Sequence, residues 1–257
     1  MCLILAAWQA QRDFPLIVAA NRDEYFARPT RSAGFWADAP NILAGRDLSA
    51  GGTWLGITRG GRFAALTNYR DPRREKQAAT SRGALVSDFL KGSASSLDYL
   101  AAIEDIAPAY NGFNLLVCDG ETLACHNNVE QRTRVLEPGI HGLSNHVLNT
   151  PWPKVTAAKL ALNASLHTLP ETQPLFDFLR DTTPAPDNEL PSTGVSLDWE
   201  RRLSSIFVRG EPSIGYGTRS STVLVAGAQG RIIFDEQEWH ADASAASRQR
   251  FSFSLGT

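Results

Sequence analysis

Two short apolar runs near the start of the chain, residues 2–8 and 15–20, most constrain how it can fold. Each run has the length of a strand, and the polar segment QAQRD separates them, so together they predict an antiparallel β-hairpin. If the turn is centred near Arg12, antiparallel pairing sets Cys2 beside the polar quartet NRDE at 21–24. Chemically active side chains are therefore expected at the open end of this hairpin.

The rest of the chain carries strand patterns at both ends and helical patterns between them. A second hairpin, with its turn at Gly60-Gly61, is predicted within 53–69 and leaves Asn68 at a strand end, whereas 26–52 is expected to be a loop. Helices are predicted at 81–92, 95–110 and 151–166, with shorter ones at 174–181 and 197–208, and strands are predicted at 112–127 and 215–239.

This order of elements favours an α+β fold in which two packed antiparallel sheets are covered by helices. The first strand and the long strands near the C-terminus can be neighbours at the centre of a sheet, which would bring Arg219 toward Cys2. We expect a single domain over residues 1–257. Within it, the Pro-rich polar segment 181–194 is expected to be a long surface loop rather than a linker.

Composition and charge exclude several classes of function. With 43% hydrophobic residues and a net charge of -2, the chain should be globular and should not be a general nucleic-acid binder. No run approaches the roughly 18 apolar residues of a membrane span, and no secretory signal is visible, so we expect a cytoplasmic protein without an integral membrane segment. The three widely spaced cysteines predict neither a disulfide framework nor a metal site, and the oligomeric state is not predicted.

Cys2 has two interpretations. A cysteine near the N-terminus is most often a small core residue, and charged residues at a strand end most often form a surface ion pair. If Met1 is removed, however, Cys2 carries a thiol nucleophile and an α-amine whose pKa near 8 suits a general base. Arg22 could then lower the pKa of the thiol, and Asp23 could hold the amine in place.

Several segments along the chain resemble the hallmark segments of the NRDE family, also called the transport and Golgi organisation family. They are ANRDEYFARPT, GGTWLGI, ALTNYRDP, SRGALVSDFL, GLSNHVLNTPWPK and YGTRSSTVL, and the resemblance runs from residue 1 to about 240. It implies a four-layer αββα fold similar to that of Ntn hydrolases. Among these, bile salt hydrolases and penicillin V acylases also begin Met-Cys and cut non-peptide amides.

The resemblance also implies roles for particular residues. Cys2 would be the nucleophile, with Asp23 as partner of the amine, Arg22 as the cation beside the thiol and Arg219 as a second cation facing it. Asn68 and Asn145 would form an oxyanion hole or orient the substrate. In those acylases the arginine and aspartate of the second strand are not adjacent, whereas here they are neighbours and should point to opposite faces of the strand.

The same resemblance is compatible with the hydrolase function and with two others. The hydrolase interpretation implies a small-molecule amide or thioester substrate and no cofactor. The family is also linked to haem trafficking and to lipid or acyl-CoA handling, which would make haem the cofactor and His146, in GLSNHVLNT, the best axial-ligand candidate. A third possibility is an interaction scaffold that has lost hydrolase activity.

Overall fold

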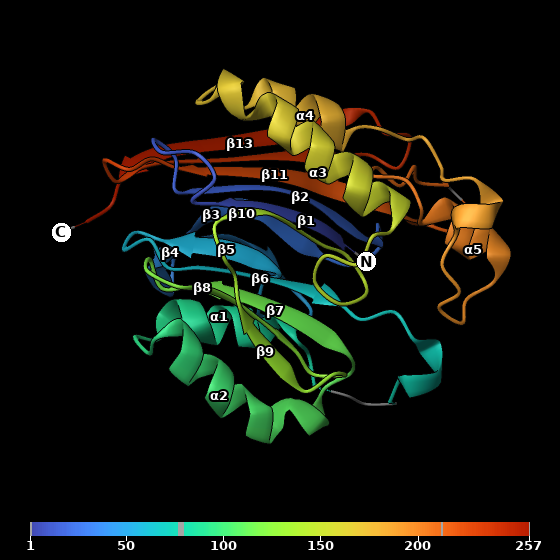
Figure 1. Cartoon of the computed structure of the whole chain (residues 1–257), viewed down its shortest axis with the longest axis horizontal. Helices are drawn as coiled ribbons and strands as arrows, with labels where there is room; N and C mark the ends of the chain where they lie inside the picture. The colour runs from blue at the N-terminus through green and yellow to red at the C-terminus, as the bar shows by residue number, and fades with distance from the viewer. Residues whose placement is uncertain (1, 77–79, 212, 257) are drawn as a thin grey trace.

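The structure is a computed structural model that describes residues 2–76, 80–211 and 213–256. Two antiparallel sheets lie face to face, and helices cover the outer face of each one (Figure 1). The predicted α+β class and the four-layer αββα sandwich are therefore confirmed.

The first sheet has six strands in the order β10-β1-β2-β11-β12-β13. The predicted hairpin forms its centre, and Cys2 pairs directly with Arg22. The register is as expected because both apolar runs are short and the polar segment between them leaves little freedom. The strands of this sheet are β1 (Cys2–Trp8), β2 (Leu16–Tyr25), β10 (Gly139–Leu143), β11 (Tyr216–Ala226), β12 (Arg231–Trp239) and β13 (Ala245–Ser254).

The second sheet has seven strands joined in chain order, from β3 to β9. Consecutive antiparallel pairing of this kind needs only short connections. Its strands are β3 (Thr30–Trp36), β4 (Ala39–Asp47), β5 (Leu55–Thr58), β6 (Phe63–Asn68), β7 (Phe113–Cys118), β8 (Leu123–Asn127) and β9 (Arg132–Val135).

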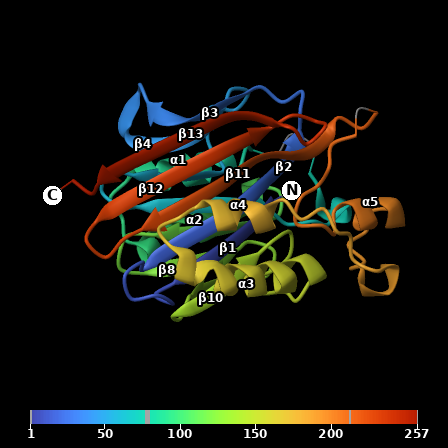
Figure 2. The ribbon, with the colours of Figure 1, turned by 90° about the horizontal axis from the view of Figure 1, so that it is seen from above.

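The helices divide between the two outer faces. Helices α3 and α4 cross the first sheet, as the view from above shows (Figure 2), whereas α1 and α2 pack under the second sheet (Figure 1). Helix α5 lies beyond the end of the sandwich at which β1 begins. The helices are α1 (Gly83–Lys91), α2 (Ser96–Ile106), α3 (Pro153–Ser165), α4 (Gln173–Leu179) and α5 (Leu197–Arg202), with 3-10 turns at Pro72–Arg74, Ala107–Ala109, Leu166–Thr168 and Asp187–Glu189.

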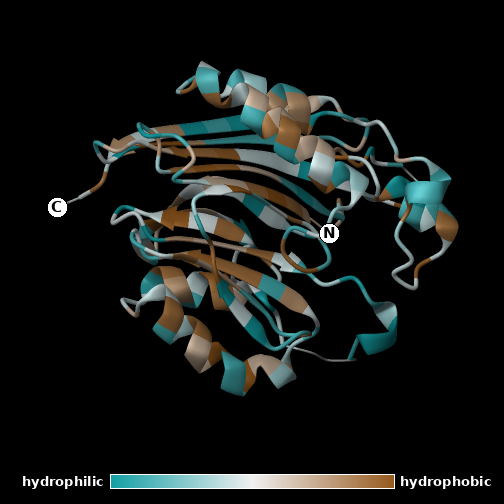
Figure 3. Cartoon of the chain, in the orientation of Figure 1, coloured by the Kyte–Doolittle hydropathy of each residue, from teal (hydrophilic) through white to brown (hydrophobic). Residues whose placement is uncertain are grey.

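Alternation along β1 and β2 divides the core into two layers. Because successive side chains of a strand point to opposite faces, even-numbered residues of this hairpin pack between the sheets and odd-numbered ones pack under α3 and α4. The edge strand β13 is largely hydrophilic (Figure 3), as suits a strand without a second neighbour. The inner layer is apolar from Ile4 to Trp8 and changes to polar side chains only at Cys2 and Arg22.

Three expectations about the elements were wrong. Residues 26–52 are not a loop but contain β3 and β4, whose pairing is interrupted by shifts of register that break the sequence alternation. A further strand, β13, follows the two predicted C-terminal strands. Strand β11 does not neighbour β1, because β2 lies between them. Residues 181–194 form a mostly exposed connection with one 3-10 turn, and the single domain stays a prediction.

Candidate active site

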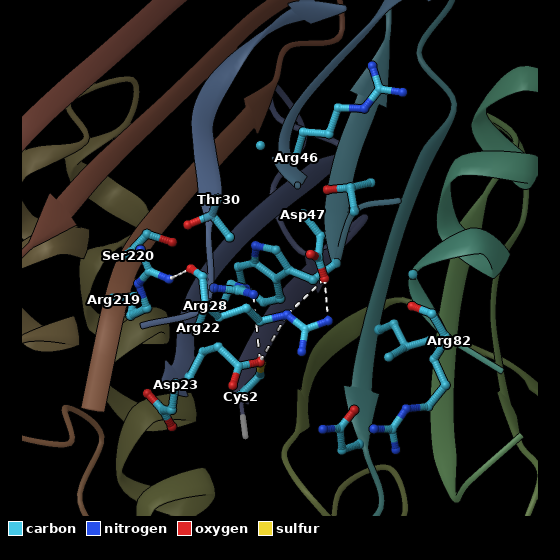
Figure 4. A pocket seen from close by; sticks show the side chains of 18 of the residues that line it. Cys2, Arg22, Asp23, Arg28, Thr30, Arg46, Asp47, Arg82, Arg219 and Ser220 are labelled. Carbon is cyan, nitrogen blue, oxygen red and sulfur yellow. Dashed lines mark hydrogen bonds and ion pairs between the residues drawn. The ribbon is translucent and has the colours of Figure 1, made fainter. Parts of the chain in front are cut away.

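A cavity of about 310 Å³ opens between the two sheets at the end where β1 begins (Figure 4). The first sheet contributes the ends of β1, β2, β11 and β12 to its wall, and the second sheet contributes β3, β4 and β6. The segment that leads into α1 closes the wall on the far side. Five of the six predicted catalytic residues line this cavity, namely Cys2, Arg22, Asp23, Asn68 and Arg219.

Cys2 forms part of the cavity wall with 8% of its surface exposed, and its thiol is free. Arg22 is its direct partner in the β1–β2 register, so the two side chains share the face between the sheets, about 5 Å apart at Cβ. Burial raises the pKa of the Cys2 thiol, and Arg22 lowers it without reversing that effect. Loss of hydration thus outweighs the nearby cation, and the role of Arg22 in lowering the pKa of the thiol stays a prediction.

Asp23 lies on the opposite face of β2, as alternation requires, and still borders the cavity because β1 begins at Cys2. Its carboxylate accepts a hydrogen bond of 2.6 Å from the hydroxyl of Thr218, directly across on β11. Burial raises the pKa of Asp23, and the buried ammonium of Lys154 opposes that rise. The adjacency of Arg22 and Asp23 is thus accommodated by the strand end, where both faces of β2 reach the start of β1.

Asn21 has a structural role on the same face as Asp23. Its Nδ2 donates to the carbonyls of Leu179, at 2.8 Å, and Ile206, at 2.9 Å. Its Oδ1 accepts a hydrogen bond of 2.6 Å from Ser221 on β11. These bonds tie the end of α4 and the segment after α5 to the sheet. The YGTRSS segment of β11 therefore lies directly beside the NRDE quartet of β2, and their residues pair in the sheet.

Asn145 and Asn68 are joined by a hydrogen bond, but they lie differently with respect to the cavity. Asn145 is fully buried, does not line the cavity, and donates from Nδ2 to the backbone carbonyl of Asn68 at 2.9 Å. Its neighbour Ser144 donates from Oγ to the backbone carbonyl of Cys2 at 3.0 Å. The Ser144-Asn145 pair thus braces the strand ends that carry Cys2 and Asn68. Of the two asparagines, Asn68 is the one that borders the cavity.

Arg219 reaches the cavity through a β-bulge. Thr218 pairs with Asp23 and Ser220 pairs with Arg22, so Arg219 is the extra residue of β11. Its Nη1 donates to the backbone carbonyls of Tyr25 and Arg28, which holds the strand end and the following turn. Burial lowers the pKa of Arg219. The guanidinium thus binds backbone at the cavity rim, and its predicted role opposite the thiol stays a prediction.

His146 lies outside the cavity wall. Its Nδ1 is 2.9 Å from the hydroxyl of Thr150, and its ring packs between Tyr69 and Trp152. Burial lowers its pKa, which favours the neutral ring. The structure gives His146 a packing role in the GLSNHVLNT segment, and haem binding stays a prediction. Within residues 2–76, 80–211 and 213–256, no group of three His, Cys, Asp or Glu is arranged to hold a metal.

Three functional candidates were missed in the sequence. Lys154 is buried, donates to the carbonyl of Leu203 at 2.8 Å, and has a pKa lowered to about 8 by burial. Glu236 lines the cavity, accepts from the backbone N–H of Ala33 at 2.6 Å, and has a pKa raised to about 7 by burial. Arg82 lines the far wall. Lys154 and Arg82 lie in the motif segments NTPWPK and SRGALV, which could have pointed to them, whereas Glu236 lies in none of the motifs.

The two face-to-face sheets and their covering helices form an αββα sandwich, a fold of the Ntn-hydrolase-like kind. A solved structure, the Caenorhabditis elegans ortholog of N-acylethanolamine-hydrolyzing acid amidase, is similar with a TM-score of 0.50 and 12% identity. The similarity covers 87% of this chain and 92% of that one, and it concerns the fold.

The chain belongs to the Transport and Golgi organisation 2 family, whose model matches residues 1–241. The mouse homologue is 34% identical and the human homologue 35% identical, each over 99% of both chains. The Drosophila melanogaster protein is 29% identical over 87% of this chain and 86% of its own. The resemblance seen in the sequence motifs is thereby confirmed. None of the helices in the described part of the chain has the length and apolarity needed to span a bilayer.

Proposed function

We propose that this protein is an N-terminal-cysteine hydrolase that cleaves a small-molecule amide or thioester. The observation that carries the proposal is the position of Cys2, at the start of a central strand and in the wall of a cavity large enough for a small ligand. Arg22 is fixed opposite it by the β1–β2 register. Because this register depends on the whole hairpin, the pair is held in place before any substrate binds.

The proposed reaction begins after Met1 has been removed. Since burial raises the pKa of the Cys2 thiol, the thiol needs a base to become a nucleophile. The α-amine takes the thiol proton as sulfur bonds to the substrate carbonyl carbon. It then gives that proton to the leaving amine as the C–N bond breaks, which leaves an acyl thioester on Cys2. Water, deprotonated by the same amine, attacks the thioester, and the proton returns to the departing thiolate.

The surrounding residues serve these steps in different ways. Asp23, oriented by Thr218, holds the α-amine close to the thiol. The amide group of Asn68 and a backbone N–H stabilise the oxyanion of the tetrahedral intermediate, which is typically worth about 3 kcal/mol per donor. Arg22 stabilises negative charge on the sulfur as the acyl thioester is hydrolysed. Asn145 contributes indirectly, by fixing the backbone of Asn68.

The proposal is tested with untagged protein and a panel of acyl amides and acyl thioesters of increasing chain length, including an N-acylethanolamine, by measuring release of the amine or thiol. Cys2→Ala should lower turnover by about four orders of magnitude or more, because it removes the nucleophile. Cys2→Ser should leave a trace of activity. Cys125→Ala, which alters a buried cysteine of the inner core, is the matched control and should keep turnover at temperatures where it is folded.

Circular dichroism of Cys2→Ala should match that of the wild type, which separates loss of chemistry from loss of fold. Equal turnover by the wild type and Cys2→Ala would overturn the proposal. So would the absence of turnover by wild-type protein from which Met1 has been removed, on every amide and thioester of the panel.

A further inference from the structure

The arginines of the cavity differ in what they bind. Arg28 makes a two-point pair with Asp47, with nitrogen to oxygen distances of 2.9 and 2.6 Å. Arg46 binds Asp38 with both Nη atoms, and its guanidinium points away from Cys2 (Figure 4). These two arginines are therefore neutralised by neighbouring carboxylates and have little capacity left for a ligand.

Arg82 is placed differently. It extends from the start of α1 toward the side of the cavity at which Cys2 lies (Figure 4). Its Nη1 donates to the backbone carbonyl of Gly112 at 3.0 Å. Among the residues that the structure describes, no carboxylate forms an ion pair within 4.0 Å of its guanidinium. Arg82 is also the single charged residue that the segment 80–83 contributes to the wall.

The position of Arg82 is unfavourable for the folded protein by itself. It is the N-cap residue of α1 and makes no side-chain capping bond, so its charge lies at the positive end of the helix dipole. It is only partly exposed, and burial lowers its pKa. Glu75 and Glu24 act on the charge of Arg82 only from beyond ion-pair distance, so this partly desolvated cation at a helix N-terminus is better stabilised by an anion in the cavity.

The backbone around Arg82 is fixed by close packing of two glycines. A Cβ on Gly52 would lie 2.4 Å from the carbonyl carbon of Gly83, so the chain before β5 touches the start of α1 directly. The Thr53 N–H donates to the Gly83 carbonyl at 3.3 Å. This contact between the GGTW and SRGA segments sets the start of α1 against the cavity, with the hydroxyl residues Thr80 and Ser81 beside Arg82 in the wall.

We propose that Arg82 binds the carboxylate of the substrate, which makes the preferred substrate an anionic amide of the N-acyl amino acid class. Since Nη1 is engaged by the Gly112 carbonyl, the edge formed by Nε and Nη2 is the one that would receive the ligand, and its geometry matches the two oxygens of a carboxylate. The proposal rests on the proposed function, because it assigns a second group on the same substrate whose carbonyl Cys2 attacks.

The test uses a matched pair of ligands, N-hexanoylglycine and N-hexanoylethanolamine, which differ in the terminal carboxylate or hydroxymethyl group. Each is titrated by calorimetry into Cys2→Ala protein, which cannot cleave them. The glycine compound should bind at least tenfold more tightly than the ethanolamine compound. This preference should disappear in Cys2→Ala/Arg82→Gln. It should persist in Cys2→Ala/Arg46→Gln, the control in which another arginine of the cavity, already paired with Asp38, is removed.

The outcomes separate this proposal from the proposed function. Equal binding of the two ligands, absence of binding, or a preference that survives Arg82→Gln would overturn the role of Arg82. Each of these results is independent of turnover, which is measured with the wild type. Cleavage that depends on Cys2 but shows no preference for the carboxylate would keep the hydrolase and reject the anionic substrate. Carboxylate binding that depends on Arg82, in a protein without turnover, would keep the role of Arg82 and reject the hydrolase.

Discussion

Asn21 and Arg22 are neighbours in one motif, but they lie on opposite faces of β2 and have different surroundings. On the face toward the helices, Asn21 is fully buried and its side chain binds three groups from α4, β11 and the segment after α5. On the face toward the second sheet, Arg22 borders the cavity, and its ion pair with Glu24 is long, at 3.7 Å. Asn21 holds the strand end in place, and Arg22 presents charge to a ligand. Mutations of Asn21 and of Arg22 should therefore affect different measurements.

The substitution with the largest expected effect is at Arg22. Arg22→Gln should lower turnover of an acyl amide by about 1,000-fold, because it removes the cation paired with Cys2 across the β1–β2 register, in a cavity where charge is poorly screened. The free energy of unfolding should change by less than about 1 kcal/mol, since the ion pair with Glu24 is long and partly exposed. Both are measured on the same preparation, by steady-state kinetics and urea denaturation.

Arg219→Gln is the control for Arg22. Because its guanidinium binds the backbone carbonyls of Tyr25 and Arg28, the change should lower turnover by less than tenfold. If Arg219→Gln abolishes turnover while Arg22→Gln leaves it intact, the assignment of the cation beside the thiol is wrong.

Asn21 should show the opposite behaviour. Asn21→Ala removes the hydrogen bonds that its side chain makes to two buried carbonyls and to the hydroxyl of Ser221, so it should lower the free energy of unfolding by about 3 kcal/mol. Turnover measured well below the unfolding temperature should fall less than threefold. Asn41→Ala, at an exposed position of β4, is the matched control and should leave stability unchanged. Intact stability in Asn21→Ala would show that the helix-facing side does not hold the strand end.

Glu236 provides a smaller effect that depends on pH. Its pKa is raised from 4.5 to about 7 by burial, and Arg22 and Glu238 are the charged groups that act on it. Because the folded chain holds this proton more tightly than the unfolded one, the free energy of unfolding should fall as pH rises between these values. The expected decrease from pH 5 to pH 7 is about 2 kcal/mol. Glu236→Gln should remove that decrease, whereas Glu121→Gln, at an exposed turn, should retain it. If the free energy of unfolding of Glu236→Gln still falls by the same amount from pH 5 to pH 7, a group other than Glu236 titrates in that range.

The sequence was sufficient for the hairpin and its register, because local apolar runs and a short polar connection determine them. It was insufficient for β3 and β4, where register shifts interrupt the alternation, and for β13, whose exposed residues resemble a loop. Among the site residues, Cys2 and Arg22 follow from pairing alone. The location of Asn145 behind the cavity wall depends on a contact with residue 68, far away in sequence, which no local pattern encodes.

Buried charges were the hardest to predict. Lys154 lies at the start of a helix and Glu236 lies within a strand, and both positions are ordinary for exposed charged residues. Lys154 is buried where α3 meets the end of α5, at Leu203, and Glu236 is buried where β12 meets β3, at Ala33; both contacts are properties of the complete fold. Their pKa values, near 8 and near 7, are consequences of that packing and could not have been obtained from residue type.

The central claim is that Cys2 becomes the N-terminal nucleophile. It is tested most directly by intact-mass spectrometry of untagged protein that has been mixed with excess acyl thioester and quenched in acid. The account predicts a chain that has lost Met1 and carries one acyl group, which is absent in Cys2→Ala and in wild-type protein that retains Met1. Full turnover by protein that retains Met1 would contradict it, because the α-amine of Cys2 would then be part of a peptide bond and could not act as the base.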